Sequence, residues 1–216
     1  MLLEIREAPP FYKNGYVLGC EDTGQGVIID PGDEVDLLLR TVTEHRLDIR
    51  HILLTHAHVD HVAGVAKVKA ALTAPVYLHR DDSLLYDMVP QQAALFGFRI
   101  GQPPPLDRFY DAETPLFFGR YEIRVLLTPG HTPGGVSLLV GRSGDPPKQV
   151  FVGDTLFAGS IGRTDLPGGD FDTLIGSIRG VLFALGDDVE VYSGHGPRTM
   201  IGQERRTNPF LNGRSR

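Results

Sequence analysis

Three histidines and one aspartate fall within six consecutive residues, in the string THAHVDH that begins at Thr55. Imidazole nitrogens and carboxylate oxygens are the ligands that zinc and related divalent metals take in proteins. Protonated imidazoles crowded this closely would repel one another, whereas ligation of a cation requires their neutral form. The spacing therefore predicts a metal site. Its four candidate ligands are His56, His58, Asp60 and His61.

The elements on either side of this motif indicate how it is positioned. An apolar run at residues 52–54 predicts a buried strand, and apolar residues recur with helical spacing over 59–72. His56 and His58 are two residues apart, so in extended chain their side chains point to the same side. Asp60 would lie near the first helical turn, where exposed amide groups favour a carboxylate. A helix cap is an alternative role for Asp60, and the two roles are compatible.

Further candidate ligands follow three other apolar runs, each flanked by glycine or proline. Loops held by rigid strands can converge at one edge of a layered α/β fold, which is where binding sites are built. A single aspartate after a strand is more often a turn former, but together with the six-residue motif these residues indicate one metal centre. They are His131, Asp154 and His195.

This series of residues resembles the metallo-β-lactamase superfamily of hydrolases over nearly the whole chain. Within that superfamily the chain is most similar to short bacterial glyoxalase II-like proteins, which are hydroxyacylglutathione hydrolase-like thioesterases. The segments GSIGRTD at 159–165 and QERRTNPF at 203–210 carry this closer similarity. The resemblance implies an α/β fold of the metallo-β-lactamase type, a four-layer αββα sandwich. Periodicity alone predicts only a mixed α/β domain.

The resemblance also implies a ligand set and a reaction. One metal ion would be bound by His56, His58 and His131, a second by Asp60, His61 and His195, and Asp154 would bridge them. Up to two Zn²⁺ per chain are expected, with iron or manganese as alternatives. The implied reaction is attack of a metal-bound hydroxide on a thioester of the S-(2-hydroxyacyl)glutathione type. Asp60 is also a catalytic candidate, because it can accept a hydrogen bond from the nucleophile.

Arg163 is the candidate substrate-binding residue. In longer members of the family a basic and an aromatic residue in the matching loop grip the thiol carrier. Here Arg163 keeps the basic role, Asp165 takes the aromatic position, and no aromatic residue follows His195. We expect the guanidinium to pair with a carboxylate of the carrier, whose identity stays open. The alternative is a structural ion pair with Asp165 or Asp170.

A second reaction class shares this scaffold. The Gly-Arg-Thr-Asp segment also resembles persulfide dioxygenases, which hold a single iron with two histidines and one carboxylate. The ligands would then be His56, His131 and Asp154. A metal-bearing sensor without turnover and a β-lactam hydrolase match the residues less well. Metal content and oxygen uptake distinguish the dioxygenase from the thioesterase.

Composition limits the remaining possibilities. The 216 residues fit one domain, 1–216, built from two halves of roughly 1–110 and 111–216 without an extra C-terminal helical domain. The net charge of −6 and the lack of a basic cluster argue against nucleic acid. No apolar stretch suits a membrane helix, and the early charges exclude a secretory signal, so we expect a cytoplasmic protein. The expected partner is a small-molecule thioester, and the oligomeric state stays open.

Strand-like and helix-like segments alternate along the chain, as in layered α/β folds. Residues 81–95 are expected to be helical with an interruption at Pro90, and 97–107 to be irregular. The segment 97–107 is expected to connect the halves and to form a wall of the cleft. Phe96 and Phe98 are candidates for lining a substrate pocket, with core packing as the commoner alternative. The other expected elements are helices at 35–46, 62–72 and 171–185, strands at 49–54, 75–78 and 121–127, and a hairpin loop at 141–148.

Overall fold

The computed structural model describes residues 1–212, which form two compact units. The first unit comprises residues 1–110 and 117–121. The second comprises residues 111–116 and the chain from Glu122 onward. The single domain proposed for 1–216 stays a prediction, and its last four residues lie outside the described part.

The first unit contains a six-stranded sheet in the order β1-β2-β3-β4-β5-β6. Strands β1 to β3 are antiparallel neighbours, whereas β3, β4, β5 and β6 run parallel. Because parallel strands share a direction, the segments after β3 and β4 leave the sheet at the same edge. The strands are β1 (Leu2–Arg6), β2 (Gly15–Gly19), β3 (Gln25–Ile29), β4 (Asp48–Leu53), β5 (Val76–Leu78) and β6 (Arg108–Phe109).

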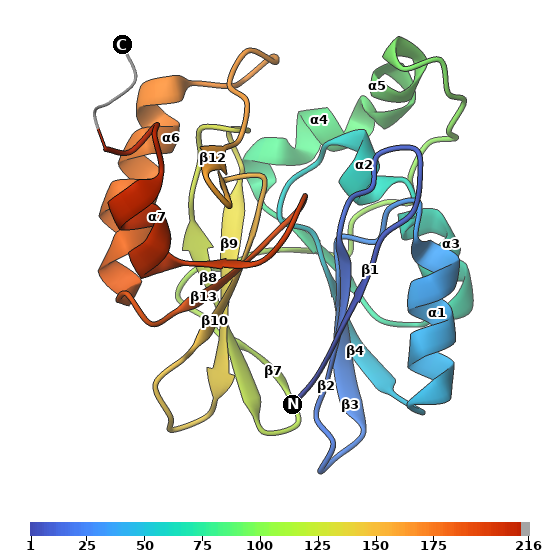
Figure 1. Ribbon diagram of the computed structural model, residues 1–216. Coiled ribbons are helices and arrows are strands. Elements are labelled where there is room, and N and C mark those ends of the chain that lie inside the picture. The colour runs from blue at the N-terminus through green and yellow to red at the C-terminus, as the bar shows by residue number, and fades with distance from the viewer. Residues whose placement is uncertain (213–216) are drawn as a thin grey trace. The chain divides into compact units, whose positions relative to one another are not determined.

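Helices of the first unit pack on this sheet through their apolar faces. In α1 the buried residues Val35, Leu38 and Val42 share one helical face and join a core with Ile28 and Ile52 of the strands. Figure 1 shows α1 and α3 on the same side of the sheet. The helices are α1 (Val35–Glu44), α2 (Val59–Val62), α3 (Val65–Ala71), α4 (Ser83–Asp87) and α5 (Val89–Leu95), with a 3₁₀ turn at Arg80–Asp82.

The second unit has its own six-stranded sheet, in the order β14-β13-β10-β9-β8-β7. Strands β10 and β13 are parallel, so the segments that follow them leave at one edge. Helices α6 and α7 cover one face of this sheet (Figure 1). The strands are β7 (Leu116–Phe118), β8 (Tyr121–Leu127), β9 (Val136–Arg142), β10 (Gln149–Gly153), β13 (Glu190–Ser193) and β14 (Thr199–Met200), beside the hairpin β11 (Leu156–Phe157) and β12 (Ser160–Ile161). The helices are α6 (Phe171–Ser177) and α7 (Ile201–Thr207), and α6 continues as a π-helix over Ile178–Leu182 and a 3₁₀ turn over Phe183–Leu185.

Two predicted helices differ from expectation, one by a break that was not predicted and one by the position of its break. The helix predicted over 62–72 begins at Val59 and is broken after Val62, so it forms α2 and α3. The interruption expected at Pro90 lies at Met88 instead, because Pro90 occupies the first turn of α5, where a helix needs no amide donor.

Phe96 and Phe98 follow α5 and are not core residues. Their exposed fractions are 53% and 39%. Both rings contact Phe11 edge to face, with centroids 5.3 and 5.7 Å apart. The commoner alternative, core packing, is therefore wrong for these two residues, and the pocket lining and the cleft wall stay predictions. Within residues 1–212, no helix has both the length and the apolar character needed to cross a membrane.

A buried ion pair stabilises the loop that follows β3. Lys13 and Glu34 are each 1% exposed, and the Lys13 Nζ lies 2.6 Å from the Glu34 Oε1. The same ammonium group donates to the carbonyl oxygen of Asp30, and the same carboxylate accepts from the amide of Gly32. Both charged groups are thus paired and hydrogen-bonded, which is the condition for burying them. The pair fixes the backbone over residues 30–34.

Lys13→Met is expected to destabilise the protein by about 3 to 5 kcal/mol, because it leaves the Glu34 carboxylate buried without its cation. The double variant Lys13→Met with Glu34→Leu should recover part of that loss, since it removes both charges. Urea unfolding of the metal-free protein measures both effects. Lys67→Met is the control, because Lys67 pairs with Asp36 at an exposed site. This substitution should change the free energy of unfolding by less than about 1 kcal/mol. A Lys13 variant as stable as this control would contradict the argument.

Candidate metal centre

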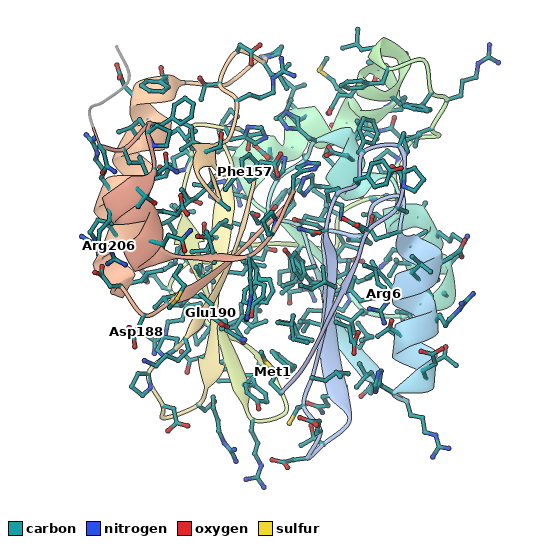
Figure 2. All side chains as sticks on the ribbon, in the orientation of Figure 1. Met1, Arg6, Phe157, Asp188, Glu190 and Arg206 are labelled. Carbon is teal, nitrogen blue, oxygen red and sulfur yellow. The ribbon has the colours of Figure 1, made fainter. Side chains whose placement is uncertain are left out.

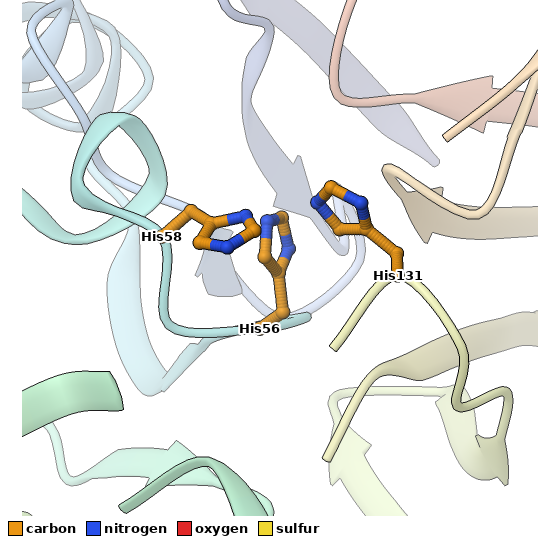
Figure 3. Close-up of side chains that lie close together, drawn as sticks. All are labelled: His56, His58 and His131. Carbon is orange, nitrogen blue, oxygen red and sulfur yellow. The ribbon is translucent and has the colours of Figure 1, made fainter. Parts of the chain in front are cut away.

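The histidine motif of the first unit follows β4 directly. The rings of His56 and His58 lie side by side in Figure 3, with centroids 4.8 Å apart and planes at 89°. The ring of His61 lies 4.1 Å from that of His56. His56 and His61 are buried, and Asp60 lies in the first turn of α2, as its position in the sequence predicts. The structure therefore gathers the motif's imidazoles into one small region.

Asp30 orients one of these histidines. Its Oδ2 lies 2.9 Å from the Nδ1 of His61, and its carboxylate also accepts from the amide and the hydroxyl of Thr55 at 2.7 and 2.6 Å. The Nδ1 of His61 thus faces an acceptor, and its Nε2 is the atom that could bind a metal. That Nε2 lies 3.6 Å from the Oδ2 of Asp60. Asp30 has a φ of 49°, a conformation uncommon outside glycine.

Two glycines allow the Asp30 loop to reach the motif. A Cβ on Gly32 would lie 1.9 Å from the carbonyl oxygen of Asp60, and one on Gly64 would lie 2.4 Å from the carbonyl oxygen of Gly32. The amide of Gly64 donates to the carbonyl of Pro31 at 2.9 Å. Any side chain at either glycine would separate the two segments. This contact also explains the break between α2 and α3.

The second unit gathers the other three candidate ligands. Asp154 follows β10 and His195 follows the parallel strand β13, while His131 lies in the loop after β8 (Figure 3). The Oδ2 of Asp154 lies 3.7 Å from the Nε2 of His131 and 3.6 Å from the Nε2 of His195. The Nδ1 of His131 lies 2.8 Å from the carbonyl oxygen of Arg163 and donates to it. This bond turns the Nε2 of His131 toward Asp154.

The loop that supplies this carbonyl also depends on a glycine. A Cβ on Gly162 would lie 1.8 Å from the carbonyl oxygen of Asp154 and 3.2 Å from the Nδ1 of His131. The loop leaves the hairpin of β11 and β12, which carries Phe157 (Figure 2). The ring centroid of Phe157 lies 6.2 Å from that of His195. The hairpin thus places Phe157 beside His195, and the loop that follows it places the carbonyl of Arg163 beside His131.

Residues of the 203–210 segment hold that hairpin in place. Glu204 is fully buried and accepts from the amide of Gly159 and the hydroxyl of Thr199 at 2.9 and 2.6 Å. Asn208, also buried, donates to Glu204 and to the carbonyl of Ser160, both at 2.9 Å. The signature segment near the C-terminal end of unit two is therefore the support of the 159–163 loop.

The carboxylate–imidazole separations fit a divalent metal. Two ligand atoms about 2.1 Å from a tetrahedral ion lie about 3.4 Å from each other. The three carboxylate–imidazole separations of 3.6 to 3.7 Å are close to that value and exceed a normal hydrogen bond. The Nδ1 atoms of His61 and His131 have protein acceptors, the arrangement that metal-binding histidines show.

The side chain of Arg163 is engaged in the ion pair that the sequence left open as an alternative. Its Nε and Nη2 atoms donate to the two carboxylate oxygens of Asp165 at 2.8 and 2.7 Å. Hydrogen bonding from Arg163 lowers the pKa of Asp165 to about 2. The pair therefore persists above that pH and is lost only as the pH falls through it. Both side chains are more than half exposed, so a ligand can still reach the guanidinium, and substrate binding by Arg163 stays a prediction.

Comparison with known proteins agrees with this geometry. Residues 8–195 match the model of the metallo-beta-lactamase superfamily. Among curated relatives, a hydroxyacylglutathione hydrolase, GloC, from Haemophilus influenzae is 37% identical, and the match covers 100% of both chains.

Solved structures show the same fold. The crystal structure of the BLEG-1 B3 metallo-beta-lactamase has a TM-score of 0.88 at 38% identity, covering 98% of this chain and 100% of that one. TTHA1623 in a di-iron-bound form has a TM-score of 0.85 at 41% identity, covering 96% and 100%. ETHE1 from Myxococcus xanthus has a TM-score of 0.80 at 29% identity, and the match covers 99% of this chain and 85% of that one. The predicted resemblance and fold class are confirmed: the chain belongs to the metallo-β-lactamase superfamily and has its α/β fold.

Proposed function

We propose that this protein is a metal-dependent hydrolase of thioesters of the S-(2-hydroxyacyl)glutathione type. The observation that carries the proposal is the grouping of histidine and aspartate side chains that follow strand ends, with carboxylate–imidazole separations suited to shared ions. The full-length similarity to a hydroxyacylglutathione hydrolase supports the choice of substrate. Membership of the superfamily and the His/Asp clusters imply binding of divalent metal.

The proposed ligand assignment is the one that the superfamily resemblance implies. One ion would be bound by His56, His58 and His131, the other by Asp60, His61 and His195, with Asp154 shared. Zinc is the proposed metal, with iron and manganese as alternatives, and the di-iron-bound form of the similar protein TTHA1623 supports iron as an alternative. The cytoplasm as the location also stays a prediction.

The chemistry needs water to replace a thiol at a carbonyl carbon. Divalent ions, when bound, supply ionised water near neutral pH and stabilise negative charge on the carbonyl oxygen. Asp60 would accept a hydrogen bond from the attacking water and orient it. The new C–O bond forms as the C–S bond breaks, which releases a carboxylic acid and a thiol. Asp30 and the carbonyl of Arg163 keep His61 and His131 in the tautomer that binds metal.

A mononuclear persulfide dioxygenase is the second candidate. It would use His56, His131 and Asp154 as iron ligands. The similarity to ETHE1 at 29% identity supports this candidate. The retention of Asp60, His61 and His195 favours the hydrolase, because a single iron has no need of a second ligand set. One specific observation favours the hydrolase. The Oδ2 of Asp60 lies 3.6 Å from the Nε2 of His61, and the Nδ1 of the same histidine is hydrogen-bonded to Asp30.

Removal of metal is expected to abolish thioester hydrolysis, and the wild-type protein should carry up to two transition-metal ions per chain. His56→Ala and Asp154→Ala should each lose metal, measured by elemental analysis after dialysis. His45→Ala is the matched control, since His45 is an exposed histidine at the end of α1. Full metal retention in both ligand variants would refute the assignment.

Hydrolysis of S-lactoylglutathione without oxygen consumption is the expected activity. Thiol release can be followed with a chromogenic disulfide, and oxygen uptake with an electrode, using glutathione persulfide as the second substrate. Nitrocefin tests the β-lactam activity named for the BLEG-1 structure. Oxygen uptake with the persulfide and no thiol release from thioesters would favour the dioxygenase instead.

Arg163→Ala is expected to raise KM for the thioester about ten- to a hundred-fold, since it removes a charge-assisted contact to the carrier. The metal content should not change, and kcat should change less than KM. Asp165→Asn is the matched variant: it releases the guanidinium, so KM should stay equal or fall. At pH values far above 2, Asp165 stays ionised and the KM ratio should not vary with pH. Equal losses of thermal stability in both variants, with KM unchanged, would identify a purely structural pair.

A further inference from the structure

The backbone between His56 and His58 is held by two side chains outside the ligand motif. The amide of Ala57 donates to the Oδ2 of Asp82 at 2.9 Å. The carbonyl of Ala57 accepts from the Nε2 of Gln92 at 3.1 Å. The same Gln92 accepts through its Oε1 from the amide of Val59 at 3.0 Å. The peptide groups before and after His58 are therefore fixed from the direction of α4 and α5.

The hydrogen bonds of Gln92 leave its amide group with a single orientation. Besides the two bonds to the motif, its Nε2 donates to the carbonyl of Leu85 in α4 at 2.8 Å. A glutamine amide has two donor hydrogens and one carbonyl oxygen, and all of these have partners here. Asp82, at the start of α4, is fully buried. Neither side chain can turn without breaking a bond to the motif.

We infer that Gln92, together with Asp82, is a positioning residue that sets the directions of the His56 and His58 imidazoles. The inference rests on the proposed function only in that these two histidines bind metal. Rotation of the Ala57 peptide group would swing the backbone on both sides of it and so move both rings. Metal sites tolerate displacements of only about 0.5 Å before affinity falls.

Packing of α5 does not depend on this amide. The core-facing residues of α5 are Val89 and Ala93, which join the apolar core of the first unit. Gln92 is only partly buried, so its loss creates no apolar cavity of the kind that destabilises a core. Substitution of Gln92 therefore leaves the apolar packing of the unit intact, and the cobalt spectrum reports the histidine geometry independently of stability.

The experiment compares Gln92→Met with Gln91→Met. Methionine has nearly the length of glutamine but lacks its donors and acceptor, and Gln91 is the exposed neighbour in the same helix. Zinc affinity is measured by competition with a chromogenic chelator, and the melting temperature is measured on the metal-free proteins. Visible spectra of the cobalt-substituted proteins report ligand geometry. Gln92→Ala and Gln91→Ala form a second pair, which carries the test if the methionine variant does not fold.

Gln92→Met and Gln92→Ala are expected to bind zinc about ten- to a hundred-fold more weakly at one site, with an altered cobalt spectrum. Their metal-free melting temperatures should lie moderately below those of the Gln91 variants, because backbone groups of Ala57, Val59 and Leu85 lose a hydrogen-bond partner. Wild-type zinc affinity and spectrum in the Gln92 variants overturn the inference. So does a loss of affinity with an unchanged cobalt spectrum. Wild-type protein that binds zinc but cleaves no thioester refutes the proposed substrate and leaves this test valid, whereas wild-type protein that binds no zinc overturns both.

Discussion

Close backbone contact at glycine is the constraint on which both ligand clusters depend. In the first unit, Gly32 and Gly64 let the loop after β3 touch the histidine motif, so that Asp30 reaches the Nδ1 of His61. In the second unit, Gly162 lets a loop touch Asp154, so that the carbonyl of Arg163 reaches the Nδ1 of His131. The two units share no sequence at these places, yet each uses a missing Cβ to bring an acceptor to a histidine. The tautomer of each imidazole is fixed by that acceptor.

The sheets explain why these loops meet their targets. Asp30 and the histidine motif follow the parallel strands β3 and β4, and the amide of Asp30 extends their ladder by donating to the carbonyl of Leu53 at 2.9 Å. Asp154 and His195 follow the parallel strands β10 and β13, where the amide of Gly194 donates to the carbonyl of Gly153 at 2.8 Å. Parallel neighbours end at one edge, so residues distant in sequence become neighbours there. This rule of sheet geometry does not depend on the chemistry of the ligands.

Local patterns in the sequence predicted a mixed α/β domain and the strand-end positions of the candidate ligands, whereas the metallo-β-lactamase fold was predicted from the family resemblance. Apolar runs followed by glycine and a polar residue predict a strand and its end without knowledge of the fold. The break between α2 and α3 was not predictable, because it comes from contact of Gly64 with a loop more than thirty residues away in sequence. Asp82 and Gln92 were missed for the same reason: each contacts the motif across more than twenty intervening residues. The ion pair of Arg163 with Asp165 was one of two alternatives for Arg163. Which alternative holds depends on the conformation of the loop, which local sequence patterns do not determine.

Glu204 has a consequence for the dynamics of the second unit. It lies on α7, yet it receives hydrogen bonds from Gly159 before β12, from Thr199 in β14 and from Asn208 after the helix. Unwinding of α7 would leave the buried Thr199 and Asn208 and the part-buried amide of Gly159 without their acceptor, so the helix and the hairpin should open as one cooperative segment. In hydrogen exchange the amide of Gly159 and the amides of α7 should then share one opening free energy, although more than forty residues separate them in the chain.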